Sequence, residues 1–122
     1  MAIISFSLRH KRIMKENILK EFVSTSRQFC KTHNIKISDI RQEYFESRPF
    51  VSFWVDSKAI TSVTFRSFKK GTKYSVVVNE DFSELFCEKF GHADRPVGNK
   101  SYSNTWSTYD AGTFVEMTQK FV

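Results

Sequence analysis

One polar stretch near the end of the chain holds the side chains best suited to catalysis. Residues 91–100 show no hydrophobic periodicity and carry four such side chains: His92, Asp94, Arg95 and Lys100. Histidine exchanges protons near neutral pH, and arginine stabilises charge on a phosphoryl group. With a partner from the neighbouring segments (Glu43, Glu46 or Arg66) they would suit a small ribonuclease that needs no metal. The alternative is a polar surface loop, and we assign no catalytic residue.

Other signatures of catalysis or metal binding are absent from the sequence. It contains no phosphate-binding glycine loop, no HExxH, no CxxC pair and no G-x-S-x-G. Cys87, His92 and Asp94 are three potential ligands of mixed type, which is weak evidence for zinc. We therefore expect neither a metal nor a cofactor. Cys30 and Cys87 are expected to be free, buried thiols, with one disulfide as the alternative.

The basic side chains are concentrated at the N-terminal end. Residues 1–36 carry eight basic and two acidic side chains, whereas the remaining 86 residues carry eleven of each, so this segment accounts for the whole net charge of +6. The run 9–12 is expected at a helix start, where free N–H groups favour a bound phosphate. The candidate anion-binding residues are Arg9, Lys11, Arg12, Lys20, Arg27 and Lys31. The alternative is a solvated basic helix.

A second candidate surface comes from the alternation of side chains in the central strands. One set of alternate residues, including Val51, Phe53 and Val76, reads as the core. The opposite set mixes aromatic and basic side chains: Phe50, Trp54, Arg66, Phe68 and Lys73. Exposed aromatic rings beside cations are the means by which RNA-binding sheets stack bases. The alternative is that the C-terminal segment covers this face with Tyr102, Trp106, Phe114 and Met117.

The hydrophobic patterns predict the elements that position these residues. We expect a strand over 3–8, a helix over 11–33 that stops at Asn34, and a second helix over 81–90 that Asp81 caps and Gly91 ends. Strands are predicted over 49–56, 59–68 and 72–79, and the ambiguous segment 35–45 is interpreted as a strand. A C-terminal hairpin is predicted from 102 to 121, with its turn at 110–112. The expected fold is α+β: a long amphipathic helix on an antiparallel sheet, with a short second helix.

Length and composition limit the class of protein. A chain of 122 residues, 40% hydrophobic and 16% aromatic, suits one domain over residues 1–122 and excludes a disordered chain. No apolar run has the length of a membrane span. The basic residues follow the apolar N-terminal stretch, which is the reverse of a signal peptide. We therefore expect a cytoplasmic protein with no membrane partner, and we make no prediction of its oligomeric state.

These observations favour a small basic binding module that is not an enzyme. Its basic helix would contact nucleic acid or a ribonucleoprotein, mainly through phosphates. The first alternative is a protein–protein interaction or inhibitor module, of the kind phages and mobile elements encode, that docks on an acidic partner. The ribonuclease described above is the second alternative.

Overall fold

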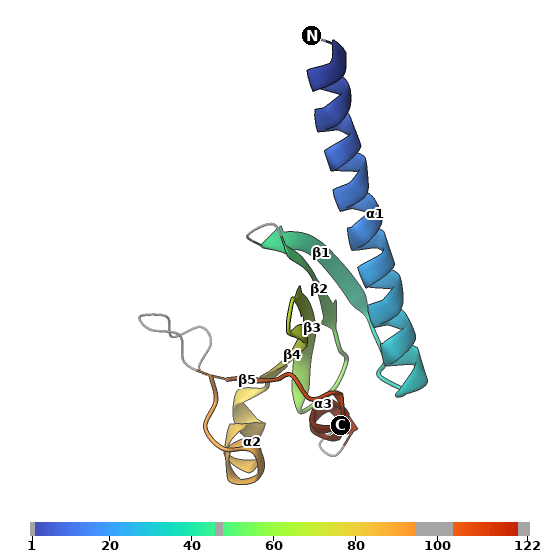
Figure 1. The fold of residues 1–122 in the computed structure, drawn as a ribbon. Helices are drawn as coiled ribbons and strands as arrows, with labels where there is room; N and C mark the ends of the chain where they lie inside the picture. Colours follow the sequence, from blue (N-terminus) through green and yellow to red (C-terminus); the bar gives the residue numbers. More distant parts are fainter. Residues whose placement is uncertain (1, 46–47, 95–103, 120–122) are drawn as a thin grey trace.

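The computed structural model describes residues 2–45, 48–94 and 104–119, which form one sheet and three helices (Figure 1). All five strands pair with their sequence neighbours in antiparallel fashion, in the order β1-β2-β3-β4-β5. The elements are α1 (Ala2–Thr32), β1 (Asp39–Phe45), β2 (Arg48–Trp54), β3 (Ile60–Phe68), β4 (Gly71–Val78), a 3₁₀ turn η1 (Glu80–Phe82), α2 (Ser83–Phe90), β5 (Thr105–Thr108) and α3 (Ala111–Gln119). This confirms the predicted α+β class and the meander of antiparallel strands.

Helix α1 begins much earlier than its hydrophobic pattern indicated. It starts at Ala2 and runs for 31 residues, so the strand predicted over residues 3–8 is wrong. No glycine or proline interrupts this stretch, and a helix once formed extends more readily than it starts anew. The first half of α1 projects beyond the sheet, and only its second half lies alongside the strands (Figure 1). Met14 and Ile18 occupy apolar positions of the helical pattern, but they are 50% and 49% exposed.

Asn34 ends α1, as predicted. Its φ of 58° is the left-handed conformation that closes many helices. The N–H of Ile35 donates to the carbonyl of Cys30 at 2.8 Å, and the N–H of Asn34 donates to that of Lys31 at 3.3 Å. These two bonds make a Schellman motif and turn the chain back toward β1. Cys30 and Ile35 are both buried beside this turn, so the end of the helix is tied to the core.

The core lies between the sheet and the helices. Alternate residues of β2, β3 and β4 are buried against them, which confirms Val51, Phe53 and Val76 as core residues. Phe65 of β3 is the centre of an aromatic cluster that joins two helices to the sheet. Its ring centroid lies 5.6 Å from Phe29 of α1, 5.4 Å from Phe53, 5.3 Å from Tyr74 and 5.3 Å from Phe114 of α3.

The C-terminal segment is not a hairpin. After the short strand β5 the chain enters α3, where a second strand over residues 113–121 had been predicted. Asp110 caps this helix, because its Oδ2 accepts from the N–H of Thr113 at 2.9 Å and from its hydroxyl at 2.6 Å. Phe114 and Met117 follow one turn apart and are buried. The β-branched residues Thr113 and Val115 are typical of a strand, which explains the wrong prediction. The capped helix forms instead because it buries Phe114 and Met117 together.

The second helix has a different cap from the predicted one. Asn79, and not Asp81, supplies the capping side chain: its Oδ1 accepts from the N–H of Asp81 at 3.1 Å. The 3₁₀ turn η1 follows, and α2 begins at Ser83. Gly91 ends α2 with a φ of 83°, the positive φ for which its glycine was predicted. Phe86 of α2 packs on Trp106 of β5, with ring centroids 5.4 Å apart.

We expect the turn at Asn34 to be sensitive to its side chain. Replacing Asn34 by Ala puts a residue with no local hydrogen bond into the left-handed region, and should lower the free energy of unfolding by about 1 kcal/mol. Asn34→Gly should match or slightly exceed the parent protein, because glycine adopts this φ without strain. Urea denaturation of the three proteins measures the difference. Equal losses in both variants would contradict the assigned Schellman turn.

We expect Phe65 to contribute more to the stability than an aromatic residue on the opposite face of the sheet. Phe65→Ala should lower the free energy of unfolding by about 3–5 kcal/mol, because it leaves a cavity among four rings. Phe68→Ala, three residues along the same strand and half-buried on the other face, should cost about 1 kcal/mol. Denaturant unfolding followed by circular dichroism gives both values, and similar losses would refute the one-sided core.

Candidate functional site

The described helices all pack on one face of the sheet. Phe29 of α1 and Phe114 of α3 contact the ring of Tyr74. Helix α2 packs on Trp106, which is the cross-strand partner of the buried Val76 and therefore lies on the same face. The C-terminal segment therefore lies on the core side, so the alternative that it covers the other face with Trp106, Phe114 and Met117 is wrong; Tyr102 lies outside the described residues. We call the other face of β1–β5 the open face. None of the described helices covers it.

The strand register places the open-face side chains in rows across the sheet. Phe50, Arg66 and Lys73 are cross-strand partners and form one row. The adjacent row carries short hydroxyl side chains: Ser52, Thr64, Ser75 and Ser107. Trp54 begins the next row, opposite Ser62. Side chains two residues apart on a strand share a face, so the register brings together all five residues predicted as a stacking surface.

Arginine side chains lie over three of the open-face aromatic rings. The guanidinium carbon of Arg41 is 5.1 Å from the centroid of Trp54. Arg48 lies 4.9 Å from Phe68, and Arg66 lies 5.4 Å from Phe50. Each contact is a cation–π pair between neighbouring strands, worth about 0.5–1 kcal/mol at such exposed positions. The pairs hold planar cations and rings together on one surface.

Arg41 and Arg48 were absent from the sequence-predicted site. Arg41 lies in the segment 35–45, which was ambiguous in the sequence, and Arg48 comes just before the strand predicted over 49–56, so neither residue could be assigned to a face. The signal that identifies them is the pairing of β1 with β2, which sets Arg41 opposite Ser52 and Arg48 opposite Phe45. With Arg66 and Lys73, they give the open face four basic side chains against the acidic pair Asp39 and Glu43. Residues 37–122 carry equal numbers of basic and acidic side chains, yet the open face that they form has more basic than acidic ones.

The hydroxyl row is internally bonded. Ser52 Oγ and Thr64 Oγ1 are 3.2 Å apart, and Ser75 Oγ and Ser107 Oγ are 2.8 Å apart.

The aromatic residues of the open face differ in exposure. Trp54 and Tyr109 are the more exposed, at 38% and 52%, whereas Phe50 and Phe68 are half-buried. Tyr109 lies edge-on to Phe68, with centroids 6.3 Å apart. The open face thus combines stacking surfaces, fixed cations and hydroxyl groups.

The basic residues of α1 lie on a different side of the molecule. Lys20, Arg27 and Lys31 are exposed on the helix that packs on the core face. Arg9, Lys11 and Arg12 lie within α1, so the helix start expected beside them is wrong. Anion binding by their side chains stays a prediction. Their N–H groups are inside the helix, where backbone carbonyls accept from them.

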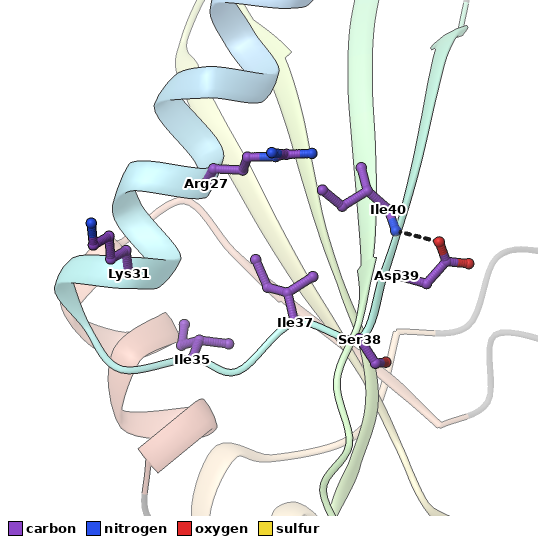
Figure 2. Close-up of a pocket in the computed structure, with 7 residues that line it drawn as sticks. All are labelled: Arg27, Lys31, Ile35, Ile37, Ser38, Asp39 and Ile40. Carbon is purple, nitrogen blue, oxygen red and sulfur yellow. Dashed lines mark hydrogen bonds between the residues drawn. The ribbon is translucent and has the colours of Figure 1, made fainter.

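A groove separates the end of α1 from the edge strand β1 (Figure 2). It has a volume of about 730 Å³ and is lined by Arg27, Lys31, Ile35, Ile37, Ser38, Asp39 and Ile40. Arg27 extends from α1 toward β1, and Ile37 and Ile40 point into the space between them (Figure 2). The groove thus has an apolar floor with basic side chains on its helical side.

The predicted catalytic loop is described only in part. His92 Nδ1 lies 3.7 Å from Cys87 Sγ of α2, and the N–H of Asp94 donates to the carbonyl of Thr105 at 2.6 Å. Arg95, Lys100 and Glu46 lie outside the described residues. Glu43 and Arg66, the other suggested partners, belong to the open face, so the part of the chain that is described does not assemble the set around His92.

Two further observations concern metals and membranes. In the described ranges, no three His, Cys, Asp or Glu side chains gather closely enough to hold a metal ion. Among these same residues, no helix combines the length and apolar character that crossing a bilayer requires.

Comparison with protein-family models, curated proteins and solved structures found no match for this chain.

The two thiols should differ sharply in reactivity. Both are free; Cys30 is fully buried at 0% exposure, and burial raises its pKa to about 12, whereas Cys87 is partly exposed. Iodoacetamide at pH 8 should label native protein once, at Cys87, and unfolded protein twice. Since the pKa of Cys30 is higher in the folded state than the ordinary thiol value of 9.0, its contribution to stability is complete below pH 9 and declines between pH 9 and about pH 12.

Mass spectrometry of digested protein locates the label, and urea denaturation at pH 8 and pH 10.5 measures the decline. Cys87→Ser should take no label while folded, and Cys30→Ala should lose less stability than the parent protein over this pH interval. Labelling of Cys30 in the native protein would contradict its placement in the core.

Proposed function

We propose that the protein is a non-catalytic module that binds single-stranded nucleic acid on its open face. The observation that carries this proposal is the set of three arginine–aromatic pairs on the sheet face that the described helices leave uncovered. Unpaired bases stack on aromatic rings and on guanidinium planes, and they are the parts of a nucleic acid that a sheet can reach.

The separation of the rows suits a strand of nucleotides. Trp54 and Phe50 lie two residues from Ser52 on β2, in the rows on either side of the hydroxyl row. Bases that stack on these two rings would lie beside Ser52 and Thr64, whose hydroxyl groups donate to and accept from base edges or sugars. Arg66 and Lys73 are cross-strand partners in the row of Phe50, where they would contact phosphates.

The charge of the open face supports an anionic ligand. Four basic side chains against two acidic ones give a modest local excess, which favours phosphates without requiring duplex geometry. Stacking is tolerant of sequence, because every base has a flat π surface. We therefore expect low sequence preference and a stronger dependence on strandedness: single strands should bind more tightly than duplexes, whose bases are already stacked.

The basic helix of the sequence-based hypothesis stays a prediction. Its exposed residues Lys20, Arg27 and Lys31 lie on the side of the sheet away from the stacking surface. The two surfaces therefore give different expectations for mutagenesis: loss of α1 charges should leave binding on the open face nearly intact. The ribonuclease alternative also stays a prediction, resting on residues that include Arg95 and Lys100.

We expect the open-face rings to dominate binding of single strands. Phe50→Ala with Trp54→Ala should weaken the affinity for a twelve-nucleotide oligouridine or oligothymidine by about tenfold or more, since base stacking contributes about 1–3 kcal/mol per base. Arg66→Gln should weaken binding several-fold and reduce the dependence on salt by about one phosphate contact. Fluorescence anisotropy with a labelled strand over a salt series measures both effects, and circular dichroism checks the fold.

Matched variants separate the proposal from its alternatives. Trp54→Phe keeps a ring and should retain most of the affinity, and Met14→Ala removes an exposed apolar side chain from α1 and should have no effect. If Arg27→Gln with Lys31→Gln abolishes binding while the ring variants do not, the basic helix is the site and the open face is not. A labelled strand that shows no salt-dependent binding to the parent protein would refute both.

A further inference from the structure

The hydrogen-bonding direction of β1 can be derived from its neighbours. The N–H of Val55 donates to the carbonyl of Thr61 in β3 at 3.2 Å, so the backbone of Val55 faces β3. Backbone groups alternate in direction along a strand, so Phe53 also faces β3 and Trp54 faces β1. The bond from the N–H of Ser38 to the carbonyl of Trp54, at 2.8 Å, agrees with this assignment. Phe53 and its partner Ile40 are therefore a pair that exchanges no backbone hydrogen bonds.

It follows that Ile40, Gln42 and Tyr44 direct their backbone groups to the outer edge of the sheet. One of these donors has a local acceptor: the N–H of Ile40 donates to Oδ1 of Asp39, the preceding residue, at 2.8 Å. A side chain that satisfies an edge donor in this way protects a strand from unwanted pairing. No strand among the described residues pairs with this edge, because β1 is at the end of the strand order.

The groove beside this edge supplies specificity. The alternation that turns the Ile40 backbone outward also puts its side chain on the core face, where it lines the groove with Ile37 below Arg27 (Figure 2). Lys31 lies one helical turn after Arg27 and also lines the groove. The described residues give neither Arg27 nor Lys31 an ion-pair partner. A strand added to β1 would direct alternate side chains toward these isoleucines and cations.

We propose that the β1 edge binds an extended acidic segment of a partner protein as an added strand. Main-chain bonds to the outward groups of β1 would give the affinity, and carboxylates facing Arg27 and Lys31 would select the segment. Charge complementarity identifies the occupant: Arg27 and Lys31 line the groove, and the only acidic residue in its described lining, Asp39, points its carboxylate away from them (Figure 2). A peptide carbonyl that accepts from the Ile40 N–H would displace this carboxylate. This surface is separate from the open face, so the inference does not depend on nucleic-acid binding.

The test uses two synthetic peptides of eight residues with blocked ends, one alternating valine with glutamate and the other alternating valine with lysine. Titration of ¹⁵N-labelled full-length protein should shift the amide signals of Ile37 to Tyr44 with the glutamate peptide, and at least about fivefold more weakly with the lysine peptide. Arg27→Glu with Lys31→Glu should reverse this preference. Absence of shifts at millimolar glutamate peptide, or shifts confined to other surfaces, would overturn the proposal.

Backbone variants test the strand-addition geometry independently of charge. Gln42→Pro removes an outward N–H on an edge strand, where proline is tolerated, and should abolish peptide binding while the protein stays folded. Gln42→Ala keeps the N–H and should bind like the parent protein. If Gln42→Pro leaves peptide binding unchanged, the proposal fails. It fails likewise if the amide signals of Ile37 and Ile40 do not respond to the glutamate peptide but respond to protein concentration, which would indicate a second copy, or to a single-stranded oligonucleotide, which would indicate a nucleic acid.

Discussion

The packing of Phe65 against Phe29 and Phe114 is the interaction on which the rest of the structure depends. It joins a strand at the middle of the sheet to helices from opposite ends of the chain. Aromatic rings bury large areas, and contacts at these distances add to the energy of burial. Once α1 and α3 are both held on this side of β3, the side chains that alternate with Phe65 must face away from both helices.

One-sided burial is the physical reason for the composition of the open face. Antiparallel sheets commonly bury one face and leave the other in water, with polar residues outside. Here the second face departs from that pattern, because Trp54, Phe50 and Phe68 alternate with serine and threonine and lie under arginines. The proposed stacking of bases rests on this arrangement.

The groove and the open face place different demands on a partner. The open face offers flat rings and separated cations, which suit bases and phosphates. The groove joins a strand edge that no described strand pairs with to an apolar floor and the cations of α1, which suits an extended polypeptide with carboxylates. The C-terminal turn of α1 positions both parts of the groove, because the Schellman motif at Asn34 directs the chain from Lys31 back into β1.

Local patterns predicted much of this protein correctly. Apolar residues at every second position, such as Val51 and Phe53, predicted the core face, and the short turns between the strands predicted the meander. Both signals are local properties of the chain. Asn34 and Gly91 were identified as helix ends because positive φ limits the choice of residue. The errors fell where short segments had two local solutions, at residues 3–8 and 113–121.

Only the tertiary structure decided which side of the sheet the C-terminal segment covers. The segment from Thr113 to Val115 has β-branched residues, but it is helical because Asp110 caps the helix and Phe114 packs in the Phe65 cluster. The register of β1 likewise depends on pairing with a distant strand, so the positions of Arg41 and Arg48 over open-face rings could not be read locally. The sequence by itself determined which residues share a strand face. Long-range packing decided that the C-terminal segment joins the buried face, so the described helices leave the opposite face uncovered.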